Sequence, residues 1–147
     1  DLKLFGEEGA SGGNGLARYI TKSVTLAPNM DATDLKVYLT SSKPAGSSVR
    51  VYYRVCSQYD QQSIDEKKWT VMELISPDEE TTSNDIGEGI EPSPLEVEFG
   101  TVDDHITYSV GDQTFSEFKT YQLRRVSFAS NKARVPVLTD FRAIAVT

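Results

Sequence analysis

"SSVRVYYRVCSQYD", residues 47–60, alternates apolar and polar side chains and then ends in a polar turn. Successive side chains of a β-strand point to opposite faces of its sheet. One predicted face carries Val49, Val51, Tyr53 and Val55, and the other carries Arg50, Tyr52, Arg54 and Cys56. This stretch therefore predicts a strand with an apolar inner face and an aromatic, basic outer face.

The same two-residue period recurs along the chain between turn-forming stretches such as SKPAGSS and APNMDATD. The candidate strands are 17–26, 34–41, 48–56, 67–76, 94–100, 105–111, 118–130 and 138–147. About eight short strands spaced in this way are typical of a sandwich or barrel, and no window sustains a helical period. We expect an all-β fold, namely an antiparallel β-sandwich that is jelly-roll-like.

Apolar side chains on one face of these strands should form the core. The predicted core residues are Leu35, Val37, Leu39, Val49, Val51, Val55, Trp69 and Val71. Within 118–130, the apolar residues change phase from odd to even positions, first Tyr121 and Leu123 and then Val126 and Phe128. That change predicts a β-bulge near Arg124–Arg125, because a bulge inserts one extra residue into a strand.

The chain has 147 residues, which indicates one domain. Residues 1–16 are glycine-rich and are expected to form a flexible linker or lead-in segment before a single sandwich domain at 17–147. The chain begins with Asp1, so we expect a piece of a longer or processed protein. A long acidic loop is predicted at 76–94, either solvated or, less favoured, holding calcium, although EF-hand spacing is absent.

The formal net charge of −7 argues against nucleic acid or an anionic membrane as the main partner, because both select clustered Lys and Arg. The apolar runs are also far shorter than the roughly 20 residues that a membrane-spanning helix needs. The single cysteine, Cys56, excludes an internal disulfide and a cysteine-based metal cluster.

No motif in the sequence assembles a reactive centre. The only histidine, His105, lies in an acidic stretch without a nucleophile elbow, and the glycine-rich stretch GASGGNG lacks the Lys-Ser/Thr of a phosphate loop. We therefore predict no enzyme, no catalytic residue, no metal ligand and no cofactor. Five aromatic residues form either a sugar-binding platform or ordinary strand surface: Tyr38, Tyr52, Tyr53, Tyr59 and Trp69.

Several strings of the chain resemble a β-sandwich domain of virion structural proteins from contractile-tailed phages, similar to cyanophage baseplate or tail proteins. They are ARYITKSVTLAPNMDATDLKVYLTSSKPAGSSVRVYYRV, KKWTVMEL, FKTYQLRRVSF and VPVLTDFRAIAV, spanning residues 17–147 apart from the acidic loop. The most specific part is the ordered pair LKVYLTSSKPAG and SSVRVYYRV.

The resemblance implies a non-enzymatic building block of a phage tail or baseplate, assembled in the host cytoplasm. Its partners would be other virion proteins in a symmetric homo-oligomer or multi-copy assembly. Tyr38, Arg50, Tyr52 and Arg54 are the interface candidates, because Tyr and Arg are enriched in protein–protein interfaces. The alternative is a carbohydrate-binding or receptor-binding module of a tail protein, with a glycan as its ligand.

Overall fold

The computed structural model describes residues 15–42, 47–76, 95–129 and 137–147. The predicted segment 1–16 and acidic loop 76–94 fall almost entirely outside these ranges. Eleven strands lie within them: β1 (Gly15–Ile20), β2 (Val24–Thr25), β3 (Asp34–Ser42), β4 (Ser47–Cys56), β5 (Thr70–Val71), β6 (Glu73–Ser76), β7 (Leu95–Gly100), β8 (Tyr108–Val110), β9 (Gln113–Phe115), β10 (Thr120–Ala129) and β11 (Val137–Val146). Two short 3-10 turns are η2 (Ile64–Glu66) and η3 (Val102–Asp104).

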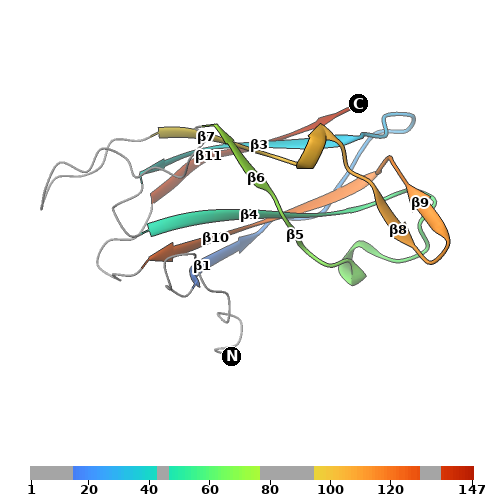
Figure 1. Ribbon diagram of the computed structural model, residues 1–147, viewed down its shortest axis with the longest axis horizontal. Coiled ribbons are helices and arrows are strands. Elements are labelled where there is room, and N and C mark those ends of the chain that lie inside the picture. Colours follow the sequence, from blue (N-terminus) through green and yellow to red (C-terminus); the bar gives the residue numbers. More distant parts are fainter. Residues whose placement is uncertain (1–14, 43–46, 77–94, 130–136) are drawn as a thin grey trace, which may run out of the picture.

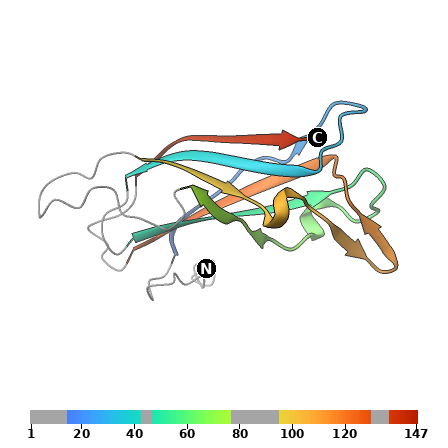
Figure 2. The same ribbon diagram turned by 45° about the horizontal axis from the view of Figure 1, so that its top comes forward.

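The strands form two antiparallel sheets that pack face to face, so the predicted all-β sandwich is confirmed (Figure 1). The first sheet has the order β1-β10-β4-β5, with β2 also paired to β10, and the second has the order β11-β3-β7-β6. The β8–β9 hairpin forms a separate ribbon that projects beyond one end of the two layers (Figure 2). Among the described residues, no helix is long and apolar enough to cross a bilayer.

The core lies between the two sheets and contains most of the predicted residues. Leu35, Val37 and Leu39 of β3 face Val49, Val51 and Val55 of β4, and all six are buried. They are joined by Ala32, Met72, Val97, Phe99, Ile106, Phe118 and Leu123. The alternation of β3 and β4 therefore predicted the inner faces correctly, because each strand has one side against the opposite sheet.

The prediction that Trp69 and Val71 belong to the core is wrong. Trp69 is half-buried and Val71 is 51% exposed, whereas Met72 is only 4% exposed. Val71 pairs with Tyr52, so both side chains lie on the outer face of the first sheet. The side chain of Met72, the next residue, points to the opposite side from Val71 and is buried in the core, and its backbone N–H donates to the carbonyl of Val51.

The predicted bulge near Arg124–Arg125 is also absent. β10 pairs with β4 without a register shift, from Thr120↔Cys56 to Ala129↔Ser47. Val126 and Phe128 therefore lie on the outer face of the first sheet, and both are nevertheless buried. A register shift occurs instead in β11, between Thr139 and Arg142. There Asp140 takes a left-handed backbone conformation with φ 51°.

Candidate functional site

Three of the four predicted interface residues lie together. Arg50, Tyr52 and Arg54 alternate along β4 on the outer face of the first sheet, as predicted. Tyr38 lies on the outer face of the second sheet, where Arg142 sits 5.3 Å from its ring centroid. The structure thus separates Tyr38 from the other three by the full thickness of the sandwich.

The outer face of the first sheet carries an arginine–aromatic layer. We define this layer by six residues: Arg50, Tyr52, Arg54, Trp69, Arg124 and Phe128. The Arg124 guanidinium carbon lies 4.3 Å from the ring centroid of Tyr52 and 5.1 Å from that of Trp69. Arg54 lies 4.3 Å from Trp69, and Arg50 lies 5.2 Å from Phe128. Such cation–π contacts stabilise by about 0.5–2 kcal/mol each.

Arg54 is held inside the domain and is not an open surface residue. Its side chain is 13% exposed, and its Nε donates to Oε1 of Gln122 over 2.8 Å. Its Nη1 donates to the carbonyls of Asp65 and Lys67 at 3.4 and 3.3 Å. Arg54 therefore fastens the η2 turn to the first sheet. Its assignment as an interface residue stays a prediction.

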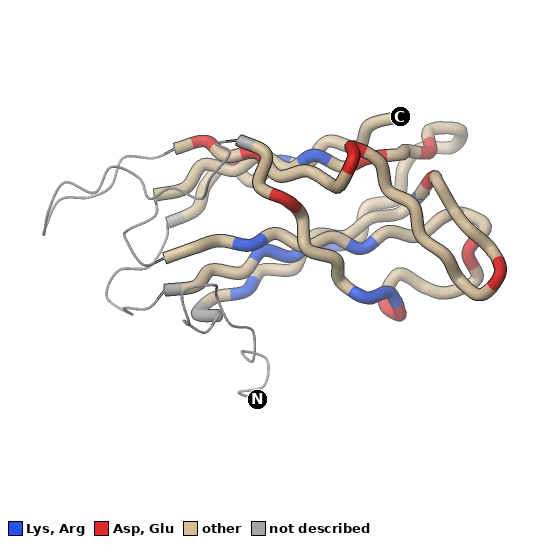
Figure 3. The backbone as a smooth tube through the Cα atoms, in the orientation of Figure 1, with Lys and Arg blue, Asp and Glu red and all other residues tan. Residues whose placement is uncertain are grey.

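Charge is segregated between the two sheets (Figure 3). The strands of the first sheet contain no carboxylate but five arginines: Arg18, Arg50, Arg54, Arg124 and Arg125. The strands of the second sheet contain two cations, Lys36 and Arg142, and five carboxylates, Asp34, Glu73, Glu96, Glu98 and Asp140. Side chains of directly paired residues on neighbouring strands lie on the same face of a sheet. Val126 pairs with Arg18 on one side and with Arg50 on the other, so both arginines lie on the outer face.

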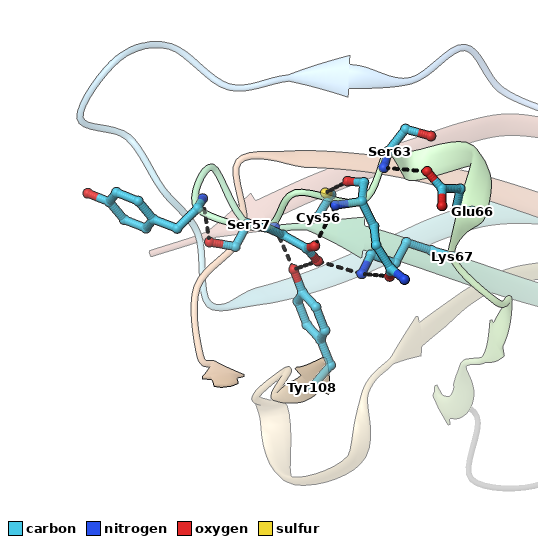
Figure 4. Close-up of polar contacts among 9 residues, drawn as sticks. Cys56, Ser57, Ser63, Glu66, Lys67 and Tyr108 are labelled. Atoms are coloured by element: carbon cyan, nitrogen blue, oxygen red, sulfur yellow. Dashed lines mark hydrogen bonds and ion pairs between the residues drawn. The ribbon is translucent and has the colours of Figure 1, made fainter. Parts of the chain in front are cut away.

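A polar cluster closes one end of the molecule next to the β8–β9 hairpin (Figure 4). Tyr108 from β8 donates its hydroxyl hydrogen to Oδ2 of Asp60 over 2.8 Å and accepts the Ser57 N–H over 2.7 Å. Lys67 forms an ion pair with Asp60, and its ammonium group lies 4.8 Å from the Tyr108 ring centroid. We call Ser57, Asp60, Lys67 and Tyr108 the hairpin latch, because they join the 57–67 loop to β8.

The latch is a structural device rather than an activated centre. Burial and the Asp60 carboxylate raise the pKa of Tyr108 above its usual range. Burial also raises the pKa of the adjacent Cys56 thiol, as does Asp60 against the opposing effect of Lys67. The thiol donates to the carbonyl of Gln62 at 3.1 Å. Both groups are therefore held in their protonated, weakly nucleophilic forms.

A groove of about 570 Å³ runs beside the latch, between β4 and the segment that leads into the hairpin. Its lining residues are Tyr53, Arg54, Val55, Gln62, Glu66, Lys67, Lys68, Thr70, Ile106, Thr107, Tyr108, Ser109 and Val110. Its volume is within the range of small-ligand sites. Two of its cations are already engaged, Arg54 with Gln122 and Asp65, and Lys67 with Asp60.

The five aromatic residues considered as a sugar platform are dispersed. Tyr38 and Tyr52 lie on opposite outer faces, Trp69 is covered by Arg54 and Arg124, and Tyr59 is 73% exposed in a loop. Tyr53 alone lines the groove. Within the described ranges, no group of three or more His, Cys, Asp or Glu residues is placed to hold a metal ion. The calcium alternative concerned the acidic loop, whose residues 77–94 lie outside those ranges.

Sequence reasoning missed Trp69, Arg124 and Phe128 as members of the layer. The doublet Arg124–Arg125 within an apolar strand was a usable signal, because one arginine of such a pair must face outward. It missed the latch altogether, because Asp60 and Tyr108 are 48 residues apart and no local pattern connects them.

Comparison of the chain with protein-family models, with curated proteins and with solved structures found no match.

Proposed function

We propose that this domain is a non-enzymatic building block of a phage tail or baseplate, located in the virion and assembled in the host cytoplasm. It packs against neighbouring virion proteins through the outer face of the first sheet. One observation carries the proposal: an arginine–aromatic layer lies on a sheet whose strands contain no carboxylate. Tyr, Trp and Arg are the residues that dominate binding energy in protein interfaces.

The sequence resemblance to tail and baseplate sandwiches supports the same proposal, and so does the sandwich architecture. A single-stranded nucleic acid fits the layer less well, because bases stack on free aromatic faces. Here the faces of Tyr52, Trp69 and Phe128 are already covered by guanidinium groups.

The test is a double substitution in the full-length protein, Arg50→Ala with Tyr52→Ala, followed by measurement of particle yield. Arg54 stays in place because it holds the η2 turn. We expect the protein to fold and particle yield to fall by about tenfold or more, since each hot-spot truncation costs roughly 2 kcal/mol of binding. Lys36→Ala with Thr40→Ala, on the outer face of the second sheet, is the matched control and should assemble normally.

The groove supplies a location for the second candidate function, a glycan-receptor module. Its size and its tyrosine, lysine and hydroxyl lining suit a polar ligand. Particles with Tyr53→Ala, which alters the groove lining, that assemble normally but fail to attach to host cells would favour this candidate. A glycan array should then show binding that Tyr53→Ala abolishes. Normal assembly of the variant with altered Arg50 and Tyr52 would overturn the interface proposal.

A further inference from the structure

We infer that the groove beside the hairpin latch binds an extended segment of another polypeptide, which adds to the open edge of β8 as a third strand. The inference goes beyond the proposed function, because it uses the groove and not the outer face of the first sheet. It also gives the groove a peptide ligand in place of the glycan of the second candidate. Backbone groups recognise the segment, and Lys68 selects a carboxylate side chain on it.

The groove is lined by the edges of strands and not by their faces. Residues 106–110 all line it, as do Tyr53, Arg54 and Val55 in β4, whereas β9 contributes no lining residue. A strand that presents one face contributes alternate residues, because successive side chains point to opposite faces. The unbroken runs therefore indicate that β4 and the 106–110 segment turn their edges toward the groove.

The edge of β8 that faces the groove has no strand beside it. β8 and β9 pair only with each other and are joined by the two-residue turn 111–112. In a hairpin with such a loop, the flanking residues Val110 and Gln113 exchange backbone hydrogen bonds. By alternation, the backbone groups of Thr107 and Ser109 point away from β9. Among the described residues, no backbone hydrogen bond reaches them on that side.

The β4 wall of the groove is an incomplete strand edge as well. The Met72 N–H donates to the Val51 carbonyl, so the alternate residues Tyr53 and Val55 also direct their backbone groups toward the β5 side. β5 ends at Thr70, which pairs with Tyr53, and no strand continues beside Val55. An extended segment in the groove can therefore form hydrogen bonds with β8 on one side and with Val55 on the other.

The size of the groove and the thinness of the ribbon both fit a third strand. The latch holds the ribbon through Tyr108 and leaves a groove of about 570 Å³ beside it. A two-stranded hairpin is marginally stable by itself, whereas three strands with a packed face are stable. Open strand edges bind extended peptides by adding them to the sheet, and main-chain hydrogen bonds supply the affinity. A glycan fits less well, because the Lys67 ammonium group lies over the Tyr108 ring.

One side chain of the lining indicates the charge of the segment. Lys68 is exposed and has no carboxylate within ion-pair distance among the described residues. The other two cations of the lining are already paired with carboxylates. Glu66, the carboxylate among the described lining residues, accepts the Ser63 N–H. Lys68 is thus the cation available to an incoming Asp or Glu, and such a contact favours an acidic segment over a basic one.

The first experiment selects ligands for the immobilised full chain from a random library of linear peptides about ten residues long, the upper length of a typical strand. Fluorescence anisotropy then compares binding of the selected peptides to the wild type and to two proline variants. Ser109→Pro removes the N–H on the groove edge of β8, and a proline is tolerated where an edge N–H faces solvent. We expect it to weaken binding by about tenfold or more, because a hydrogen bond of the added strand is lost.

The matched control is Thr114→Pro, on the opposite edge of the same ribbon. Thr114 pairs with Ser109, so its N–H also points out of the ribbon, but away from the groove. This variant should bind the selected peptides as the wild type does. A selection that yields no peptide sensitive to Ser109→Pro and insensitive to Thr114→Pro would overturn the inference.

The second experiment separates backbone recognition from side-chain recognition. A selected peptide is synthesised again with N-methyl groups on alternate residues, in each of the two phases. Methylation in the phase that faces β8 should abolish binding, because it removes the donors and the close approach of the strand, and the other phase should weaken binding less. Equal binding of all three peptides would overturn the inference. This comparison needs only the wild-type protein, so it decides the matter even if Ser109→Pro unfolds in thermal melting.

The third experiment tests the charge preference. Lys68→Glu should weaken binding of a carboxylate-containing peptide by about fivefold. Lys36→Glu makes the same change in net charge on the outer face of the second sheet and should have no effect. Equal effects of the two variants would overturn the role of Lys68. If a glycan array shows binding that Tyr53→Ala abolishes and no peptide is selected, the second candidate replaces this inference. Particle assembly that depends on Arg50 and Tyr52 would stand in either case.

Discussion

Arg50 and Arg54 lie four residues apart on the same face of β4 but have different roles. Arg50 lies over the Phe128 ring, and among the described residues no carboxylate lies within ion-pair distance of it. Arg54 stacks on Trp69 and donates to Gln122 and to two backbone carbonyls of the η2 region. An arginine on a strand surface can therefore either be available to bind a partner or connect two parts of its own chain. Which of these it does depends on the groups that its guanidinium contacts.

This difference predicts unequal costs of truncation. Arg54→Ala should lower the free energy of unfolding by about 2 kcal/mol, because it leaves charge-assisted hydrogen bonds unmade. Arg50→Ala should cost at most about 0.5–1 kcal/mol, the range of a surface change that loses one cation–π contact. Urea denaturation of both variants measures the difference. Equal midpoints would show that Arg54 does not brace the η2 turn.

Asp60 should make the stability contributed by the hairpin latch depend on pH. Burial alone would raise the pKa of Asp60, but hydrogen bonds from Lys67, from the Gln62 N–H and from Tyr108 lower it overall. A carboxyl whose folded-state pKa is lowered stabilises the fold above its unfolded value of about 3.9. That stabilisation is lost as the pH falls from about 4 through the folded-state pKa.

Asp60→Asn should therefore be less stable than the wild type at pH 7 and should lose less stability between about pH 5 and pH 2. Thermal melting across this pH range gives the comparison. Asp112→Asn, in the exposed β8–β9 turn, is the matched control and should follow the wild-type curve. Parallel curves for Asp60→Asn and the wild type would contradict the role assigned to Asp60.

At the scale of elements, the run β5–β6 passes from one sheet to the other within a few residues. β5 belongs to the first sheet and β6 to the second, and only Met72 separates them. Met72 and Leu74 point inward, whereas Val71 and Ile75 are exposed. The apolar residues of this run therefore occupy both faces.

Met72→Ala should lower the free energy of unfolding by about 2–4 kcal/mol, because it opens a cavity in the core. Val71→Ala should stay within about 0.5–1 kcal/mol, because Val71 is half exposed on the outer face. Chemical denaturation of the two single variants measures the free energy of unfolding of each, and so compares the two adjacent residues. A larger effect at Val71 would mean that the run faces the other way.

Strands with a clear alternation were predictable from the sequence, and strands with two apolar faces were not. β3 and β4 place polar residues on their outer faces, so their cores were assigned correctly. Around β5 and in β10, apolar residues lie on the outer face, and some are covered by arginine: Trp69 just before β5, Val71 in β5, and Val126 and Phe128 in β10. A hydrophobic pattern cannot distinguish burial between sheets from burial beneath a guanidinium group.

At the scale of the whole molecule, the chain crosses repeatedly between the two sheets, so we expect the two sheets to unfold together. β3 leads to β4, β5 leads to β6, and β10 leads to β11, each time from one sheet to the other. The core between the sheets is shared, since β3 and β4 residues pack against each other. The latch adds a further contact between distant parts of the chain, which only the folded arrangement reveals.

We therefore expect a single cooperative unfolding transition. Trp69 fluorescence reports on the outer face of the first sheet, and far-ultraviolet circular dichroism reports on strands of both sheets. The two signals should give the same midpoint in urea, as a two-state protein requires. An earlier fluorescence transition would show that the first sheet separates before the second.

The buried thiol of Cys56, next to the hairpin latch, can be used to measure how often this part of the protein opens locally. Cys56 is the single cysteine, is 8% exposed and donates to the Gln62 carbonyl. A disulfide reagent reacts with the thiolate, and a protonated, enclosed thiol must wait until the surrounding loop detaches. The labelling rate of the native protein thus measures the free energy of that detachment, which can be far smaller than the free energy of global unfolding. No introduced probe is needed to follow how tightly the β8–β9 ribbon is held.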